Sequence, residues 1–408
     1  MARPNVNITL GNGNLGRSAA TDDGVAALLL PGAAVSGKLE LNKHYQLSGM
    51  ADLVALGATA DNNSLVYKEV TAFYEQTGDG AELHLLVVAE ATTLTQMCDS
   101  AADSPLRKLI DASGGRVRLV GVNKIPPTEY EADTTQGIDK DAITAAEKAQ
   151  AEAKNAGAPD AEKAQAVIES YAAGKVNPFR LLMPAPAFDA EVDSLFKPRE
   201  SSTNAVCYVL ASDDAVKHTA AIGRVLGRAA SLSVHQSIGR VRSGSIGTDM
   251  YLTDGQSYID ADGLADSLHD AGYIIPVAYP RKNGAYLNGD PAAAPVTDDY
   301  AQLRYGRTVD KARIIVYDTL IDEILDDVDT DSDGDLSAGQ RTSYEGMIEN
   351  AVLTQMNGEI TSFAVSIPEG QNILTSETIR VVCRIQPKGV VETFEVTLEF
   401  TNPAIKSE

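Results

Sequence analysis

Short apolar runs, each long enough for a strand buried on both faces, recur along the first half of the chain. Pro31 and Gly32 end the first run, and a helical stretch at 64–75 separates it from the second. Strands that alternate with helices at this spacing are typical of parallel β-α-β units. Residues 21–290 are therefore predicted to form an α/β domain with a mainly parallel sheet. The strands are predicted at 25–30, 82–90, 116–122, 179–183, 204–210 and 273–279.

Two helical segments of this domain differ in composition from the rest. Ala, Glu, Lys and Gln dominate residues 139–173, which predicts two helices that pack on the sheet or cross over it. A helix of small residues is predicted at 215–230, where Gly223 and Gly227 are four positions apart. Small residues at this spacing fall on one helix face, so we expect this helix to lie close to a neighbouring element.

The pattern changes after the Ala- and Pro-rich residues 291–295. Amphipathic helices followed by strands are typical of a separate α+β domain. We assign residues 291–389 to such a domain. The helices are predicted at 310–328 and 337–356, and the strands at 361–367, 378–385 and 390–400.

Both ends of the chain have the alternating pattern of a strand with one apolar face. An apolar strand without a partner is an aggregation hazard, and it is also the element with which one chain completes the sheet of another. Two interpretations stay open: ordinary strands of their own domains, or linking arms at residues 1–20 and 390–408. The apolar residues are Val6, Ile8 and Leu10 at one end, and Phe394, Val396, Leu398 and Phe400 at the other.

Charge and composition narrow the function classes. The 408 residues carry 57 acidic and 34 basic side chains, a net charge of −23. This balance argues against partners such as nucleic acid or an anionic membrane surface, and copies that associate need specific contacts to overcome their repulsion. No apolar run reaches the roughly 18 residues of a membrane span, and the first ten residues lack the apolar segment of a signal peptide. We therefore expect the chain to fold in a cytoplasm.

The sequence offers weak evidence for nucleotide or catalytic chemistry. The stretch from Gly11 to Gly16 matches the dinucleotide pattern GxGxxG, but the strand before it alternates polar and apolar residues, and a turn stands where a helix must begin. We interpret it as a flexible hinge. The five histidines have no metal-binding spacing, no GxSxG pattern is present, and the three cysteines are expected to be buried. The basic segments 239–244 and 304–307 favour ion pairing within or between chains.

An acidic segment resembles a calcium-binding loop. Calcium needs several oxygen ligands, which carboxylates at loop positions 1, 3 and 5 provide, while glycine at position 6 makes the turn. A helix is predicted on each side. The last position holds glutamine instead of glutamate, so the expected affinity is weak, on the order of 10⁻⁴–10⁻³ M. The alternative is an acidic turn that binds nothing. The candidate ligands are Asp329, Asp331, Asp333, Asp335 and Gln340.

Several segments in order give the chain a family resemblance. It resembles the contractile tail sheath proteins of phages and related injection systems, and is most similar to the short sheath-like proteins of Bacteroidetes prophages. The resemblance spans most of the chain, although no single segment is diagnostic. The segments are residues 4–8, 11–17, 22–25, 178–182, 221–228, 237–241 and 305–312.

The resemblance implies a structural role without catalysis. Sheath subunits polymerise helically around an inner tube, and their contraction drives the tube through a target envelope. Arms from both termini of neighbouring subunits join a strand of a third subunit, which fits strand addition between chains. Other copies, the inner tube, baseplate proteins and terminator proteins are the implied partners. The particle is a virion tail or an extracellular contractile particle made in a bacterial cytoplasm.

Two other function classes stay open at this point. An α/β hydrolase-like enzyme would use the carboxyl edge of the sheet. A calcium-stabilised virion surface or binding protein would use the acidic loop at 329–340.

Overall fold

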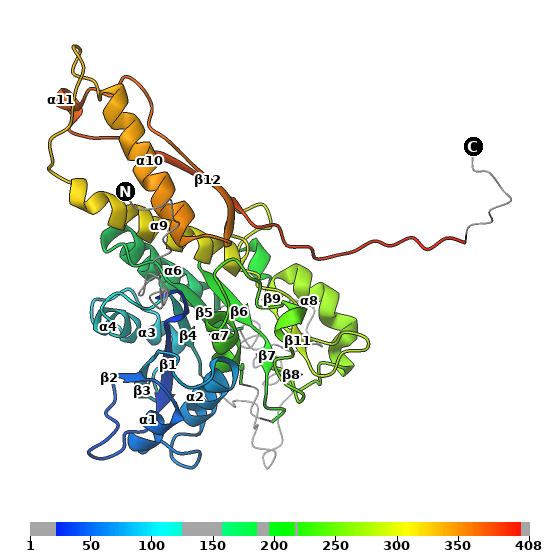
Figure 1. The fold of residues 1–408 in the computed structure, drawn as a ribbon. Coiled ribbons are helices and arrows are strands. Elements are labelled where there is room, and N and C mark those ends of the chain that lie inside the picture. The colour runs from blue at the N-terminus through cyan, green and yellow to red at the C-terminus, as the bar shows by residue number, and fades with distance from the viewer. Residues whose placement is uncertain (1–21, 125–156, 186–195, 217–218, 401–408) are drawn as a thin grey trace, which may run out of the picture.

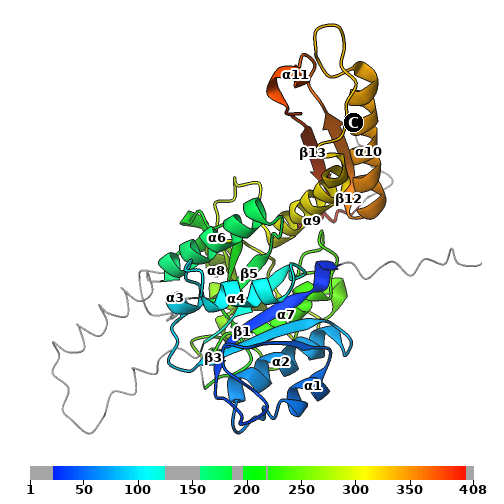
Figure 2. The same cartoon turned by 90° about the vertical axis from the view of Figure 1, so that its left-hand side faces the viewer.

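The computed structural model describes residues 22–124, 157–185, 196–216 and 219–400. A larger part holds a central sheet covered by helices, and a slender C-terminal part of two long helices and two strands extends away from it (Figures 1 and 2). The predicted α/β fold with a separate C-terminal α+β domain is confirmed. No helix among the described residues is long and apolar enough to cross a membrane.

The central sheet of the larger part has seven strands. β2 is antiparallel to β3, and all other pairs are parallel. In β1, Leu28 lies between Leu85 of β3 and Gly121 of β4. The sheet order is β2-β3-β1-β4-β5-β6-β9, with β1 at Ala26–Gly32, β2 at His44–Leu47, β3 at Leu83–Ala89, β4 at Leu119–Val122, β5 at Arg180–Pro184, β6 at Val206–Val209 and β9 at Tyr273–Ile274.

Helices cover both faces of this sheet, so β1 is buried along its whole length. Alternate residues of β1 point to opposite faces. Leu28 and Leu30 belong to one hydrophobic core, and Ala27 and Leu29 to the other. The first core lies under α1 (Met50–Ala55), α2 (Ser64–Thr77) and α7 (Ile222–Ala230), and the second under α3 (Leu94–Met97), α4 (Pro105–Ala112), α6 (Gly157–Gly174) and α8 (Ala265–Ala271).

The predicted close approach of the small-residue helix is confirmed. A Cβ atom on Gly227 would lie 2.6 Å from the carbonyl oxygen of Phe73 in α2, and one on Gly223 would overlap the backbone of Glu69. The predicted start at residue 215 is wrong, because α7 begins at Ile222. The residues before it form the short strand β7 (Ala211–Ser212) and a bridge between Ser212 and Ala220.

Short elements complete the larger part. The predicted strand at 273–279 is divided between β9 and β10, because β10 leaves the central sheet and pairs with β11. Of the predicted helical segment 139–173, α6 is confirmed, and residues 139–156 lie outside the described residues. The short elements are η1 (Asp22–Gly24), η2 (Pro198–Glu200), η3 (Val241–Ser243), β8 (Tyr251–Leu252), η4 (Asp260–Leu264), β10 (Pro276–Val277) and β11 (Tyr286–Leu287).

The C-terminal part packs two helices on a two-stranded sheet. Ile315 of α9 and Val352 of α10 share a small core with Phe363 of β12. The helix predicted at 310–328 instead spans 303–320, and the one predicted at 337–356 is confirmed, with Ser337 as its N-cap. The elements are α9 (Leu303–Leu320), η5 (Ile321–Glu323), α10 (Ala338–Gln355), β12 (Ile360–Ser366), α11 (Ile373–Ser376) and β13 (Val382–Pro387).

The cysteines correct one sequence expectation. Cys98 and Cys207 are buried as predicted, and burial raises the pKa of each thiol to about 12. Cys383 of β13 is exposed instead. It lies in a two-stranded sheet too small to bury both faces.

Candidate assembly interface

The chain after β13, residues 388–400, contains the described part of the C-terminal arm and leaves the body as an extended chain (Figure 1). It pairs with no strand among the described residues. Its apolar side chains are bare to solvent, with Phe394 82% and Leu398 92% exposed, and Val396 and Phe400 also exposed. A row of exposed apolar side chains on an unpaired backbone marks an interaction site.

The strand sheet of the C-terminal part leaves its edges open. β12 and β13 are antiparallel, with Phe363 beside Ile385 and Val365 beside Cys383. One face of β12 is covered by α10, as the burial of Ile360 and Phe363 shows. Within the described residues no third strand pairs with either edge. The free N–H and C=O groups of such edges are able to accept added strands.

The predicted N-terminal arm residues Val6, Ile8 and Leu10 lie outside the described residues, as does the stretch from Gly11 to Gly16. The described chain begins at a short turn that is tied to α9. Asp23 accepts a hydrogen bond from Lys311 at 2.6 Å, and its carbonyl oxygen accepts one from Arg307 at 3.1 Å. The N-terminal arm would therefore start from the junction of the two parts.

Helix α9 joins the two parts through buried ion pairs. Arg180 of β5 contacts Asp310 through two hydrogen bonds of 2.6 and 2.9 Å, and both side chains are almost fully buried. Its guanidinium lies against Gly306, where a Cβ atom would come within 2.5 Å of Cζ. A bidentate pair of this kind fixes orientation as well as distance. The first half of α9 is thereby fastened to the sheet, while its second half carries the C-terminal core.

The predicted ion pairing of segment 304–307 is confirmed within the chain. Arg304 forms an ion pair with buried Asp290, and Arg307 donates to the carbonyl oxygens of Ala229 and Leu232. Burial lowers the pKa of Arg307 to about 10. The role of Lys311 was not predicted. Its signal in the sequence is the spacing of Arg304, Arg307 and Lys311, which places three cations on one helix face.

The acidic loop shares several backbone features with the predicted calcium loop, but the helix predicted directly before it is absent, because α9 ends at Leu320 and η5 at Glu323. Gly334 has φ +80, Asp331 Oδ1 accepts the N–H groups of Asp333 and Asp335, and Leu336 N donates to Gln371 O at 3.0 Å. The carboxylates are not gathered: among the described residues, no group of three or more His, Cys, Asp or Glu side chains is arranged to hold a metal ion. Binding would require these side chains to turn inward, so calcium stays a prediction.

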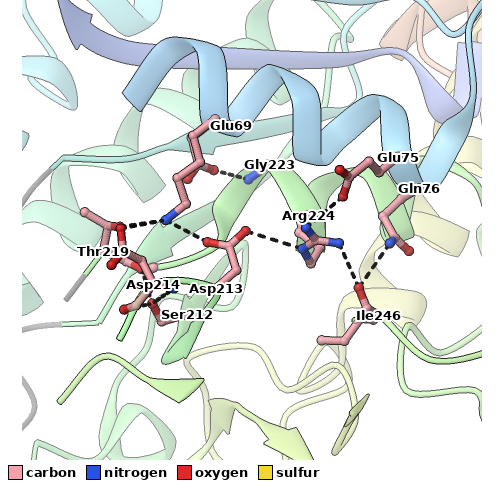
Figure 3. Close-up of polar contacts among 12 residues, drawn as sticks. Glu69, Glu75, Gln76, Ser212, Asp213, Asp214, Thr219, Gly223, Arg224 and Ile246 are labelled. Atoms are coloured by element: carbon pink, nitrogen blue, oxygen red, sulfur yellow. Dashed lines mark hydrogen bonds and ion pairs between the residues drawn. The ribbon is translucent and has the colours of Figure 1, made fainter. Parts of the chain in front are cut away.

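The carboxyl edge of the sheet, where an enzyme of this architecture would hold its substrate, contains a compact polar cluster (Figure 3). Lys68 of α2 lies 2.7 Å from Asp213 and donates to Thr219 at 3.0 Å. Arg224 of α7 lies 3.4 Å from Asp213 and 2.8 Å from Glu75. The two cations are paired with three acids, since Lys68 also lies 3.8 Å from Asp214. The arrangement fastens α2, α7 and the segment after β7 together.

Glu69 is a buried acid beside this cluster, and it accepts the backbone N–H of Gly223 (Figure 3). Burial, reinforced by the charge of Asp213, raises the pKa of Glu69 to about 8. A cavity of about 260 Å³ lies nearby at the ends of β1, β3 and β4, with Ser64, Glu90 and Lys124 in its lining. Lys124 donates to the carbonyl oxygen of Thr92 at 2.7 Å, which holds its ammonium at the rim.

Solved structures of contractile particles share this fold. The helical sheath of the anti-feeding prophage in its contracted state aligns with a TM-score of 0.58 at 12% identity, covering 98% of this chain and 99% of that chain. The sheath complex of an extracellular contractile injection system, PVC, in its contracted state gives 0.58 at 12% identity and 98% of both chains. A chain of the six-fold symmetrised anti-feeding prophage baseplate gives 0.56 at 12% identity, with 98% and 99% covered.

The protein therefore has the fold of contractile sheath subunits. Within that class, the chain belongs to the DUF2586 family: residues 3–290 match the family's N-terminal domain and residues 299–405 its C-terminal domain. No curated protein sequence matches the chain.

Proposed function

We propose that this chain is the structural subunit of a contractile tail sheath, which polymerises helically around an inner tube and contracts to drive that tube through a target envelope. The observation that carries the proposal is the C-terminal arm, whose apolar residues have no partner among the described residues. The shared fold over 98% of the chain supports it. Catalysis, nucleic acid and a membrane span form no part of the proposal.

The arms supply the links between copies. Phe394, Val396, Leu398 and Phe400 enter the C-terminal part of a neighbouring subunit, where β12 and β13 offer open edges. The N-terminal arm, with Val6, Ile8 and Leu10, adds a second strand. Open head-to-tail contacts of this kind generate helical polymers. Such links also offset the repulsion between copies that each carry a net charge of −23.

The further partners are the inner tube protein, baseplate proteins and terminator proteins. The resemblance to short sheath-like proteins of Bacteroidetes prophages supports a chain made in a bacterial cytoplasm. The assembled particle is then a virion tail sheath or an extracellular contractile particle. The domain arrangement that goes with this role is an arm and hinge at 1–20, an α/β domain at 21–290, an assembly domain at 291–389 and an arm at 390–408.

Truncation tests the proposal most directly. Removal of residues 1–16 or 391–408 is expected to leave a folded monomer but to abolish long tubes in negative-stain micrographs. Circular dichroism and size-exclusion chromatography control for folding. Ordered tubes formed by both truncated proteins would overturn the role of the arms.

Point variants separate the two faces of the C-terminal arm. Phe394→Asn together with Leu398→Asn removes apolar side chains from one face, and Thr393→Asn together with Thr397→Asn alters the other face as a matched control. Because strand addition gains affinity from backbone bonds and specificity from alternate side chains, the first pair is expected to prevent tubes and the second to permit them. Equal effects of the two pairs would contradict an arm that inserts by one face.

A further inference from the structure

The root of the C-terminal arm is held by a contact that secondary structure does not explain. β13 ends at Pro387 in the C-terminal part, yet five residues later Glu392 lies beside Arg304 of the α9 junction, with 3.5 Å between Oε1 and Nη2. We propose that Arg304 anchors the arm at Glu392, so that the arm is free only from residue 393 onward. This inference rests on the proposed function only for its consequence in the sheath.

The anchor point on α9 is rigid. Arg304 is only 5% exposed, and its guanidinium pairs with Asp290 through Nη1. Asp290 also accepts the backbone N–H of Arg304 at 2.8 Å and, through its carbonyl oxygen, that of Leu303 at 2.7 Å. The carboxylate thus caps the start of α9 and holds the side chain of its second residue. A guanidinium fixed in this way offers Nη2 to one place only.

The charge balance around Arg304 favours an added carboxylate. A second cation, Arg199, is close enough that the charge of Arg304 acts on it, and its Nη1 donates to the carbonyl oxygen of Ala301 at 2.9 Å. Burial lowers the pKa of Arg199, while Asp290 and Glu392 act to raise it. Asp290 alone leaves one positive charge in excess, and Glu392 offsets it.

The two guanidiniums also have unused donors. The Nε–H groups of Arg199 and Arg304 are both buried and have no hydrogen-bond partner among the described residues. Unmet buried donors cost free energy, so this place attracts an acceptor. The carboxylate of Glu392 contacts Arg304 at Nη2, so it lies on the same guanidinium but leaves both Nε–H groups unmet.

Both arms start from the same face of α9. Arg304 contacts the root of the C-terminal arm, whereas Arg307 and Lys311 contact Asp23 at the root of the N-terminal arm. Residues three and four apart on a helix lie on one face. A pull on either arm is therefore transmitted to the helix that joins the α/β domain to the assembly domain.

The contacts that hold the roots of the two arms differ in strength. The Asp23 contact is buried, while Glu392 is 63% exposed and makes a single long contact. An exposed pair of this kind contributes little to stability. When tension is applied, the Glu392 contact opens first. Its release moves the fixed point of the arm from residue 392 back to the end of β13, which increases the reach of the arm by at most about 17 Å. The anchor thus lets the arm lengthen when a subunit moves during contraction.

Electron paramagnetic resonance on dilute monomeric full-length protein tests the anchor. A Cys383→Ser background removes the exposed thiol, and a spin label is attached through Val391→Cys, because Cys98 and Cys207 are buried. Glu392→Gln is expected to shorten the rotational correlation time of the label about twofold. Sodium chloride at about 1 M should have the same effect on the unaltered anchor, since it screens an exposed pair.

Matched variants keep the test decisive. Glu395→Gln, three residues further along the exposed arm, should leave the label unchanged, and Arg199→Gln should loosen it less than Glu392→Gln does. Equal mobility in Glu392→Gln and Glu395→Gln would overturn the anchor, even if the protein still forms tubes. Absence of tubes in the unaltered protein would instead contradict the proposed function and leave the anchor measurement intact.

Discussion

The α/β part and the C-terminal part differ in which side chains they bury and which they expose to solvent. In the α/β part, charged side chains are buried or half-buried and paired within the chain, as Arg180 is with Asp310 and Lys68 with Asp213. In the C-terminal part, apolar side chains such as Phe394 stand in solvent, and the two-stranded sheet has open edges. Under the proposed function, the described residues of the first part are satisfied within one chain, whereas neighbouring copies complete the second part.

This contrast indicates which residues would link copies of the chain and which would form a rigid body. Side chains that find their hydrogen-bond and ion-pair partners within the chain stabilise a rigid body. Unpaired strands and exposed apolar side chains are able to bind a second copy. Helix α9 belongs to both, because its first half is fastened to the sheet and its second half forms part of the C-terminal core. Perturbations of the junction, of the α/β part and of the C-terminal part should therefore change the free energy of unfolding by decreasing amounts.

The largest effect is expected at the junction. Lys311 Nζ lies 2.6 Å from Asp23 and 2.7 Å from Glu359. Burial lowers the pKa of Lys311, but its hydrogen bonds and ion pairs with these two acids outweigh that and raise it. Lys311→Met leaves both carboxylates without their cation and should reduce the free energy of unfolding by about 3 kcal/mol in urea titrations.

The control for this variant is on the same helix. Arg313 is exposed, so Arg313→Met should change the free energy of unfolding by less than about 0.5 kcal/mol. Similar losses in the two variants would mean that helix propensity, and not the buried ion pair, holds the two parts together.

An intermediate effect, confined to the α/β part, is expected from pH. The folded-state pKa of Glu69, about 8, lies above its ordinary value of 4.5, so the folded state binds the proton more tightly. The resulting stabilisation is complete below about pH 4.5 and is lost as pH rises through about 8. The contribution of Glu69 to the free energy of unfolding should fall by up to about 3 kcal/mol between pH 5 and pH 8.

Glu69→Gln removes this titration while keeping an acceptor for the N–H of Gly223. Its stability should vary less with pH, whereas Glu90→Gln, which alters an exposed acid, should keep the profile of the parent protein. Parallel profiles of the parent protein and Glu69→Gln between pH 5 and pH 8 would show that Glu69 is ionised in the folded state. The measurement is urea unfolding at a series of pH values.

The same contrast explains what the sequence could predict. Strands buried on both faces, such as β1 and β3, have continuous apolar runs, so their positions follow from hydropathy. The start of α9 was placed at residue 310, seven residues late. The face of its first turns that packs on the sheet consists of Arg304, Arg307 and Asp310, which a hydropathy pattern takes for solvent-exposed residues. Their partners come from distant segments of the chain.

The candidate interface was predictable in one respect. Alternation marks Phe394 and Leu398 as one face of a strand, but periodicity does not say which strand they pair with, and here they pair with none among the described residues. The contact of Glu392 with Arg304 was beyond prediction, because the two residues are 88 positions apart and an exposed glutamate has no distinguishing pattern.

The smallest effect is expected in the C-terminal part, from calcium. The aspartates at 329, 331, 333 and 335 would turn inward around the ion, with Gln340 as a weak last ligand. Calcium at about ten times its dissociation constant should add about 1.4 kcal/mol to the free energy of unfolding. Asp331→Asn should abolish this gain while its Oδ1 still accepts the N–H groups of Asp333 and Asp335. Asp326→Asn, in the same acidic segment, should retain the gain in the free energy of unfolding. Calorimetry that detects no heat of binding at calcium concentrations up to about 10 mM would favour a turn that binds nothing.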